Sequence, residues 1–211
     1  MRRIELPATN TISFTLTQGI EGFGGIAMPD GTQHVSLGGI GEKDWENLNI
    51  ARENGGKILW STVCLEKKME DILLTYFMGP FNGPCEKREL FTNELLQASF
   101  LQLSSKKHLI SKVSNRFYSF KGKERDKLQG YLKSIIQWRN AFAHGNMTLS
   151  ATEGVILNYY SGAPKSEALN DGFWKTVESA FRNCDELLNK LEDIVKQAKN
   201  QKTAVFSTPI I

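Results

Sequence analysis

Apolar residues recur every three or four positions in several parts of the chain, which is the spacing of helices that bury one face. The spacing predicts four long helices, over residues 57–77, 86–103 and 123–144 and for about 25 residues from Asp171. Residues 106–117 should continue the second helix after a break at Ser104 and Ser105. A short helix over 44–53 should precede the first long helix, and Gly55 and Gly56 should separate these two helices.

Strict alternation of polar and apolar residues marks a second kind of element. Residues 155–160 and 166–169 should form a hairpin around a turn at 161–164. The same alternation predicts short strands near the N-terminus, over residues 11–17, 24–28 and 34–37. The glycines between them match no phosphate-binding loop, so we interpret them as turn residues.

These elements indicate a mainly α fold. We expect an antiparallel helical bundle of four main helices, with a small β-hairpin and short N-terminal strands. The chain should divide into a β-rich N-terminal extension (1–43), a helical domain (44–201) and a C-terminal tail (202–211). At 211 residues it is long enough for one sizeable core.

Composition narrows the class of protein. Hydrophobic residues make up 40% and charged residues 23%, as in globular proteins. No apolar run approaches the roughly eighteen residues of a membrane span, and the first residues do not match a signal peptide. We therefore expect a cytoplasmic protein without membrane contact. The three cysteines show no metal-ligand spacing, so we expect no metal or cofactor, and we interpret Cys64 and Cys184 as core residues.

Positive charge is concentrated in residues 106–139. That segment has ten Lys and Arg against Glu124 and Asp126, so it carries +8, whereas the whole chain carries +3. Such a surface suits a polyanion, because neutralised phosphates drive non-specific nucleic-acid binding. The alternative is a solvated helix face. The residues that we expect to contact RNA are Lys106, Lys107, Lys112, Arg116, Lys121 and Lys123.

Residues 115–123 mix Phe117, Tyr118 and Phe120 with cations. Aromatic rings beside cations can stack an unpaired base. The alternative is that the rings anchor the loop to the core.

The stretch 137–145 is the one around which we interpret the rest of the chain as arranged. Arg139, Asn140 and His144 lie near the end of the third long helix, which Gly145 should terminate. A guanidinium presents a planar fork to phosphate, and an imidazole gives or takes protons near neutral pH. Cleavage of a phosphodiester by a ribose 2′-hydroxyl needs both groups.

Helical geometry constrains how these side chains meet. At about 100° per residue, Arg139 falls within roughly 20° of Leu128 and Leu132, so a permanent charge lies on the apolar stripe and needs a partner or a polar cavity. Asn140 and His144 are four residues apart and neighbour one another. Arg139 and His144 are about 140° apart, so they converge only if the arginine curls, the helix unwinds or a second copy completes the site.

A structural reading of the same residues stays open. An arginine near a helix end often pairs with a carboxylate of another helix, and a histidine before a terminating glycine often binds the last carbonyls. On that reading the motif holds a fold or a dimer together and performs no chemistry.

The order of Arg139, Asn140 and, four residues after Asn140, His144, on the third long helix of a helical domain, resembles the HEPN superfamily (higher eukaryotes and prokaryotes nucleotide-binding). The resemblance implies a metal-independent endoribonuclease that acts as a homodimer, with Arg and His of both protomers meeting across the interface. It further implies His144 as general acid or base, Arg139 as the group that stabilises the phosphate, and Asn140 as the residue that orients His144 or binds the phosphate.

The resemblance also suggests a role and partners. Active members often serve as toxins or in phage defence, which implies RNA as substrate and a protein inhibitor or antitoxin. Members paired with a nucleotidyltransferase antitoxin often have Tyr two residues after the His, where this chain has Asn146, so such a partner is not expected. The alternative is a non-catalytic HEPN-like dimer that binds nucleotide, nucleic acid or protein. In either dimer, Trp138 is the apolar residue that we expect the partner to cover.

Overall fold

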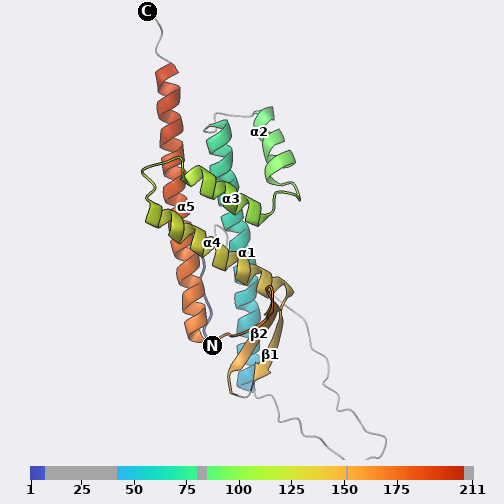
Figure 1. The fold of residues 1–211 in the computed structure, drawn as a ribbon. Helices are drawn as coiled ribbons and strands as arrows, with labels where there is room; N and C mark the ends of the chain where they lie inside the picture. Colours follow the sequence, from blue (N-terminus) through green and yellow to red (C-terminus); the bar gives the residue numbers. More distant parts are fainter. Residues whose placement is uncertain (8–41, 80–84, 151, 207–211) are drawn as a thin grey trace, which may run out of the picture.

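The computed structural model describes residues 1–7, 42–79, 85–150 and 152–206, with side chains described to residue 199 (Figure 1). The predicted N-terminal strands over 11–17, 24–28 and 34–37 lie outside these residues.

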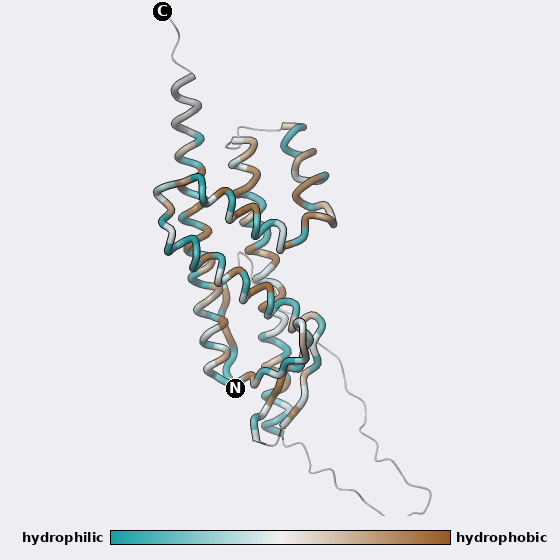
Figure 2. Tube along the Cα trace, in the orientation of Figure 1, coloured by the Kyte–Doolittle hydropathy of each residue, from teal (hydrophilic) through white to brown (hydrophobic). Residues whose placement is uncertain are grey.

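Three long helices form the body of the protein: α1 (Glu42–Met78), α4 (Gly122–His144) and α5 (Asp171–Phe206) (Figure 1). Each helix has polar and apolar residues interleaved along its length, as Figure 2 shows in teal and brown, and the apolar side chains meet in one core. Within the described ranges, no helix has the length and apolar content needed to cross a bilayer.

Contacts between side chains fix the directions of these helices. Near the start of α4, Lys190 of α5 pairs with Glu124 at 2.6 Å, whereas near its end Trp138 packs against Phe173, with ring centroids 6.1 Å apart. Low numbers on α4 thus meet high numbers on α5, so these two helices are antiparallel. The predicted helical bundle is confirmed, and α4 and α5 have the antiparallel packing that we expected.

The long helices α1 and α5, by contrast, run in the same direction. Lys68 of α1 forms an ion pair with Asp185 of α5, and about two to four turns further along, Lys199 lies 5.2 Å from the ring centroid of Tyr76. The three long helices thus alternate in direction along the chain, with α4 antiparallel to both α1 and α5. Parallel packing is possible because the shorter helices between them in sequence return the chain to the starting end.

The second predicted helix is divided in the structure. Residues Glu86–Phe91 form α2, Thr92–Leu96 form a π-helical turn, and α3 begins only at Leu103 and ends at Ser114. The break therefore falls before Leu103 and not at Ser104 and Ser105. Residues 97–102 leave the helix and turn across the bundle toward α4, where they form a wall of the pocket described below.

A three-stranded antiparallel sheet lies at the C-terminal end of α4 (Figure 1). The predicted hairpin is present as β2 (Gly154–Tyr160) and β3 (Pro164–Ala168), and Val155 and Leu157 of β2 point into the core. Strand β1 (Asn146–Ser150) was not predicted. It follows α4 after a single residue, so no turn signal separates it from the helical pattern.

Helix α1 runs without interruption through Gly55 and Gly56, contrary to the sequence prediction. A Cβ on Gly55 would lie 2.7 Å from Cδ1 of Phe142, closer than side chains tolerate. Phe142 in turn packs on Trp174, with ring centroids 5.9 Å apart. Gly55 is thus a packing residue, because its missing side chain lets the end of α4 approach α1.

The two glycines offer a matched test of this packing. Gly55→Ala should destabilise the protein by about 1–3 kcal/mol, because the added methyl group displaces Phe142. Gly56→Ala should stabilise it by about 0.5–1 kcal/mol, since a Cβ there meets nothing within 4 Å and alanine favours the helix. Urea denaturation measures both, and equal free energies of unfolding for the two variants would contradict the packing role of Gly55.

The first seven residues belong to the helical body, so the predicted domain boundary at residue 43 does not separate them from it. Ile4 is fully buried, and its backbone N–H donates to Oδ1 of Asn54 at 3.0 Å. The Asn54 amide donates in return to the carbonyl of Arg2, also at 3.0 Å. The buried Asn54 side chain thus ties the N-terminus to α1.

Two cysteines and the end of α5 match the sequence predictions to different degrees. Cys184 is buried as expected, and burial raises the pKa of its thiol to about 12, which makes it unreactive. Cys64 is only partly buried. Helix α5 continues to Phe206, so the first part of the predicted C-terminal tail is helical, and residues 207–211 lie outside the described residues.

Candidate functional site

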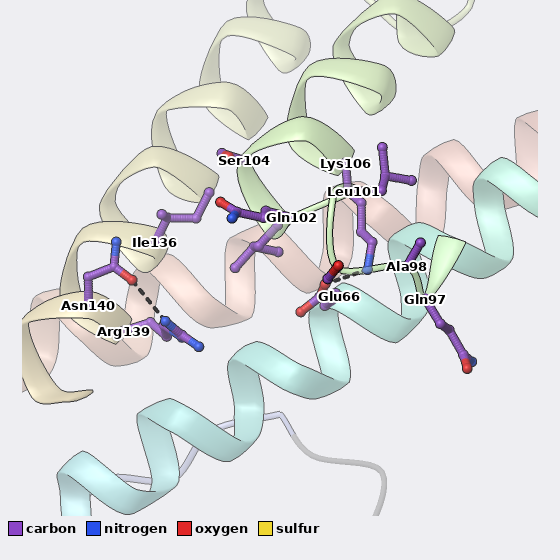
Figure 3. Close-up of a pocket in the computed structure, with 12 residues that line it drawn as sticks. Glu66, Gln97, Ala98, Leu101, Gln102, Ser104, Lys106, Ile136, Arg139 and Asn140 are labelled. Carbon is purple, nitrogen blue, oxygen red and sulfur yellow. Dashed lines mark hydrogen bonds and ion pairs between the residues drawn. The ribbon is translucent and has the colours of Figure 1, made fainter. Parts of the chain in front are cut away.

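The last turns of α4 form one side of a pocket of about 470 Å³. Ile136, Arg139 and Asn140 line it from α4, and Glu66 lines it from α1. Residues 97–106 supply the remaining walls, with amide and hydroxyl side chains beside leucines (Figure 3). Two of the three predicted motif residues therefore face a mixed polar and apolar cavity that three separate segments build.

Arg139 has the environment that a charge on an apolar stripe requires. Its side chain is exposed, and in the described part of the chain it pairs with no carboxylate. Its Nη1 donates to Oδ1 of Asn140 at 3.1 Å, as Figure 3 shows. The structural alternative, an arginine held by a carboxylate of another helix, is thus not found among the described residues. The guanidinium keeps donors free for an anionic ligand.

His144 is the last residue of α4, and it is exposed. The helix stays intact up to this residue, so it does not unwind to bring His144 toward Arg139. His144 is not among the residues that line the pocket, whereas Asn140, its neighbour one turn earlier, is. Within one chain, the structure therefore links Arg139 to Asn140 and leaves His144 at the outer edge.

Gly145 joins this helix end directly to the sheet. Its backbone is extended, with φ −84° and ψ 171°, so it ends the helix without a left-handed turn. A Cβ at this position would lie closest to the carbonyl oxygen of Ala141 in the last helical turn, 2.8 Å from the carbonyl oxygen of Asn158 and 3.0 Å from Leu157. Glycine is thus required because the last turn of α4 and strand β2 both lie so close to this residue.

Lys106 corrects one of the predicted RNA contacts. Its side chain is 5% exposed, and its ammonium group lies 2.5 Å from Glu66 and 2.6 Å from Glu70 of α1. Burial acts against the charged form, but the hydrogen bonds that the ammonium donates to both glutamates outweigh it, so the pKa of Lys106 is raised. This lysine is enclosed by carboxylates and ties the start of α3 to α1, so it has no ammonium to offer to a phosphate.

Most of the other predicted RNA-binding cations lie away from the motif. Lys107 is partly buried, while the remaining four, Lys112, Arg116, Lys121 and Lys123, are exposed around the loop between α3 and α4. Sixteen residues of straight helix separate Lys123 from Arg139, which is about 24 Å at 1.5 Å per residue. The structure thus places the basic cluster and the motif at opposite ends of α4.

Trp138, the residue that we expect a partner protomer to cover, has a contact within its own chain. It is partly buried and packs edge-on against Phe173 of α5, with ring centroids 6.1 Å apart. Because its ring already packs within the chain, only the part that remains exposed could be covered by a second protomer.

Sequence reasoning missed the cluster beside the pocket. Glu66 and Glu70 stand four residues apart, so they share a face of α1, and both reach Lys106. A pair of glutamates at this spacing on a helix with a buried face was a usable signal, because buried carboxylates need cationic partners. Among the described residues, no group of three His, Cys, Asp or Glu side chains is arranged to hold a metal ion.

Comparison of this chain with protein-family models, with curated proteins and with solved structures finds no match to any of them.

Proposed function

We propose that this protein is a metal-independent endoribonuclease of the HEPN type, which cleaves RNA by attack of a 2′-hydroxyl on the adjacent phosphate. The observation that carries the proposal is the state of Arg139, a permanent charge at a pocket with Asn140 as its only hydrogen-bond partner among the described residues. An unpaired guanidinium beside a cavity suits an anion, and the exposed imidazole of His144 lies one turn from Asn140.

Each of the three side chains has a chemical task in this proposal. The imidazole of His144 takes the proton of the 2′-hydroxyl while the hydroxyl oxygen forms a bond to phosphorus. The bond from phosphorus to the 5′-oxygen breaks, and the same imidazole, now protonated, gives that oxygen a proton. Arg139 stabilises the added charge on the pentacoordinate phosphate. Asn140 holds the guanidinium through Oδ1, and its amide N–H groups can donate to a phosphate oxygen.

A site shared by two protomers accounts best for the arrangement within one chain. Each composite site would take Arg139 and Asn140 from one chain and His144 from the other, so that one imidazole acts first as base and then, once protonated, as acid. His144 also lies outside the pocket that Arg139 and Asn140 line, about 140° around the helix axis from Arg139. In a symmetric dimer, the same surface of both chains meets, so the pocket of one chain and the histidine of the other can complete each other.

The test mixes two inactive variants, Arg139→Ala and His144→Ala, under conditions that exchange protomers. Cleavage should return in the mixture, because one of the two composite sites then regains an intact set of side chains, and it should persist in EDTA. A monomer that cleaves RNA would contradict the shared site, and loss of cleavage in EDTA would contradict the metal-independent mechanism.

A second candidate function is a non-catalytic module of the same type. The separation of His144 from the pocket favours it, because Arg139 and Asn140 could hold a phosphate without any acid or base. This module should bind RNA or nucleotide tightly and show no turnover at high protein concentration. Its affinity should fall in Arg139→Ala and stay unchanged in His144→Ala.

A further inference from the structure

The loop that joins α3 to α4 uses its three aromatic residues in two different ways. Phe120 is fully buried, and Phe117 packs against Tyr76 of α1, with ring centroids 6.1 Å apart. Tyr118, between them, is 103% exposed and thus stands free of the protein surface. The two phenylalanines anchor the loop, and the tyrosine projects from it.

Hydrogen bonds fix the backbone on both sides of this tyrosine. The N–H of Phe117 donates to Ser114 at 3.3 Å, and the N–H of Phe120 donates to the carbonyl of Phe117 at 3.1 Å. At the start of α4, Glu124 accepts from the backbone N–H of Lys121 at 3.1 Å. The exposed ring therefore stands on a rigid support, and a contact made by it costs little ordering of the backbone.

The surroundings of Tyr118 are positively charged. Residues 112–127 contain six Lys and Arg against Glu124 and Asp126, which gives +6 − 2 = +4. Glu124 is already neutralised by Lys190 at 2.6 Å. Four exposed cations without an ion pair in the described part of the chain lie within six positions of Tyr118 along the chain: Lys112, Arg116, Lys121 and Lys123.

We propose that Tyr118 is a stacking platform for an unpaired base of single-stranded RNA, and that the cations around it bind the phosphates on either side of that base. A free aromatic ring stacks on any exposed base, whereas the bases of a duplex are already stacked on one another. Phosphate contacts from the surrounding cations hold the strand in place. The choice of RNA as ligand rests on the proposed function, but the binding step requires neither Arg139 nor His144.

This platform is distinct from the pocket at the other end of α4. From Gly122 to Arg139 the helix axis extends about 26 Å, at 1.5 Å per residue. A strand with about 3.4 Å per stacked nucleotide covers that distance with about eight nucleotides. A single strand can thus touch the platform and the motif together only if it is at least that long.

The test measures RNA affinity by fluorescence anisotropy in His144→Ala protein, so that no cleavage interferes. For a single strand of about sixteen nucleotides, Tyr118→Ala should weaken binding about 5- to 150-fold, which is the usual effect of removing one base–aromatic stack. Tyr118→Phe should keep the affinity, because it keeps the ring. The matched control is Tyr160→Ala, since Tyr160 is 76% exposed on β2, away from the basic loop, and its loss should change nothing.

Two outcomes overturn the platform. One is unchanged single-strand affinity in Tyr118→Ala, which would leave the ring free for a protein partner. The other is an equal loss of affinity for a blunt RNA duplex, which would indicate a general effect on the loop. These outcomes are independent of the proposed function: a protein that never cleaves RNA but loses affinity in Tyr118→Ala keeps the platform and refutes the nuclease. Conversely, if the protein cleaves RNA but Tyr118→Ala leaves its RNA affinity unchanged, the nuclease is supported and the platform is refuted.

Discussion

Alanine in place of Arg139 or His144 should reduce the rate of RNA cleavage by a factor of about 10²–10⁴. General acid–base catalysis by one side chain contributes about 10²–10⁴-fold, and removal of one group that stabilises transition-state charge costs about 10²–10³-fold. Single-turnover cleavage of a labelled RNA measures the effect, because it isolates the chemical step from product release.

The same variants should keep the stability of the wild type. Both side chains are exposed, and Arg139 has no ion pair in the described residues, so their loss should change the free energy of unfolding by less than about 0.5 kcal/mol. Ala143→Ser provides the control, because it alters an exposed position beside His144 without touching the motif. If Arg139→Ala instead unfolds the protein, the arginine is a structural residue and the catalytic assignment is wrong.

The second large effect concerns Lys106. Lys106→Met should lower the free energy of unfolding by about 3 kcal/mol, because it leaves the carboxylates of Glu66 and Glu70 close together without their shared cation. The estimate lies at the low end for a broken buried pair, since the Glu66 side chain is 28% exposed and can regain water. Chemical denaturation at neutral pH measures the loss.

A compensating variant separates charge from packing. Lys106→Met combined with Glu66→Gln and Glu70→Gln should recover most of the stability, because no buried charge then lacks a partner. If the triple variant is as unstable as the single one, the lysine stabilises the fold through its packing and not through its charge.

The difference in unfolding free energy between wild type and Lys106→Met should shrink at high pH. Although burial opposes the charged ammonium, its hydrogen bonds with the two glutamates raise the pKa of Lys106 above the ordinary lysine value. The charge therefore contributes in full below that ordinary value, about pH 10.4, and the contribution is lost as the pH rises through the higher pKa of the folded state. The difference between wild type and Lys106→Met should be constant near neutral pH and shrink above about pH 10.4.

Some elements were predictable because their pattern is local. The stretch over 123–144 has its apolar stripe within one helix, and α4 ends at His144 with Gly145 after it, as predicted. Gly55 was misjudged for the opposite reason. Its role depends on Phe142, which is 87 positions away along the chain. No local pattern distinguishes a glycine that ends a helix from a glycine that makes room for an aromatic ring of another helix.

In the candidate site, too, the features set by local sequence were predictable and those set by distant residues were not. Residue type and spacing identified Arg139 and Asn140, because a charge on an apolar stripe requires a special environment wherever it occurs. The pocket beside them was not predictable, since its opposite wall includes residues 97–102, which the sequence indicated as helix and which leave the helix in the structure. Lys106 was misassigned because a count of charges along the chain does not show that two glutamates of α1 enclose this one.

The direct junction between α4 and β1 has a consequence for how the motif can open. His144 is the last helical residue, and Asn146 is already paired with Asn158 in the sheet, so Gly145 alone separates two cooperative structures. Loss of register in the sheet would pull on the final helical turn, and fraying of that turn would release the edge of β1. Local unfolding at this end should therefore involve helix and hairpin as one unit, so that anything that binds the hairpin also changes how often His144 leaves its place.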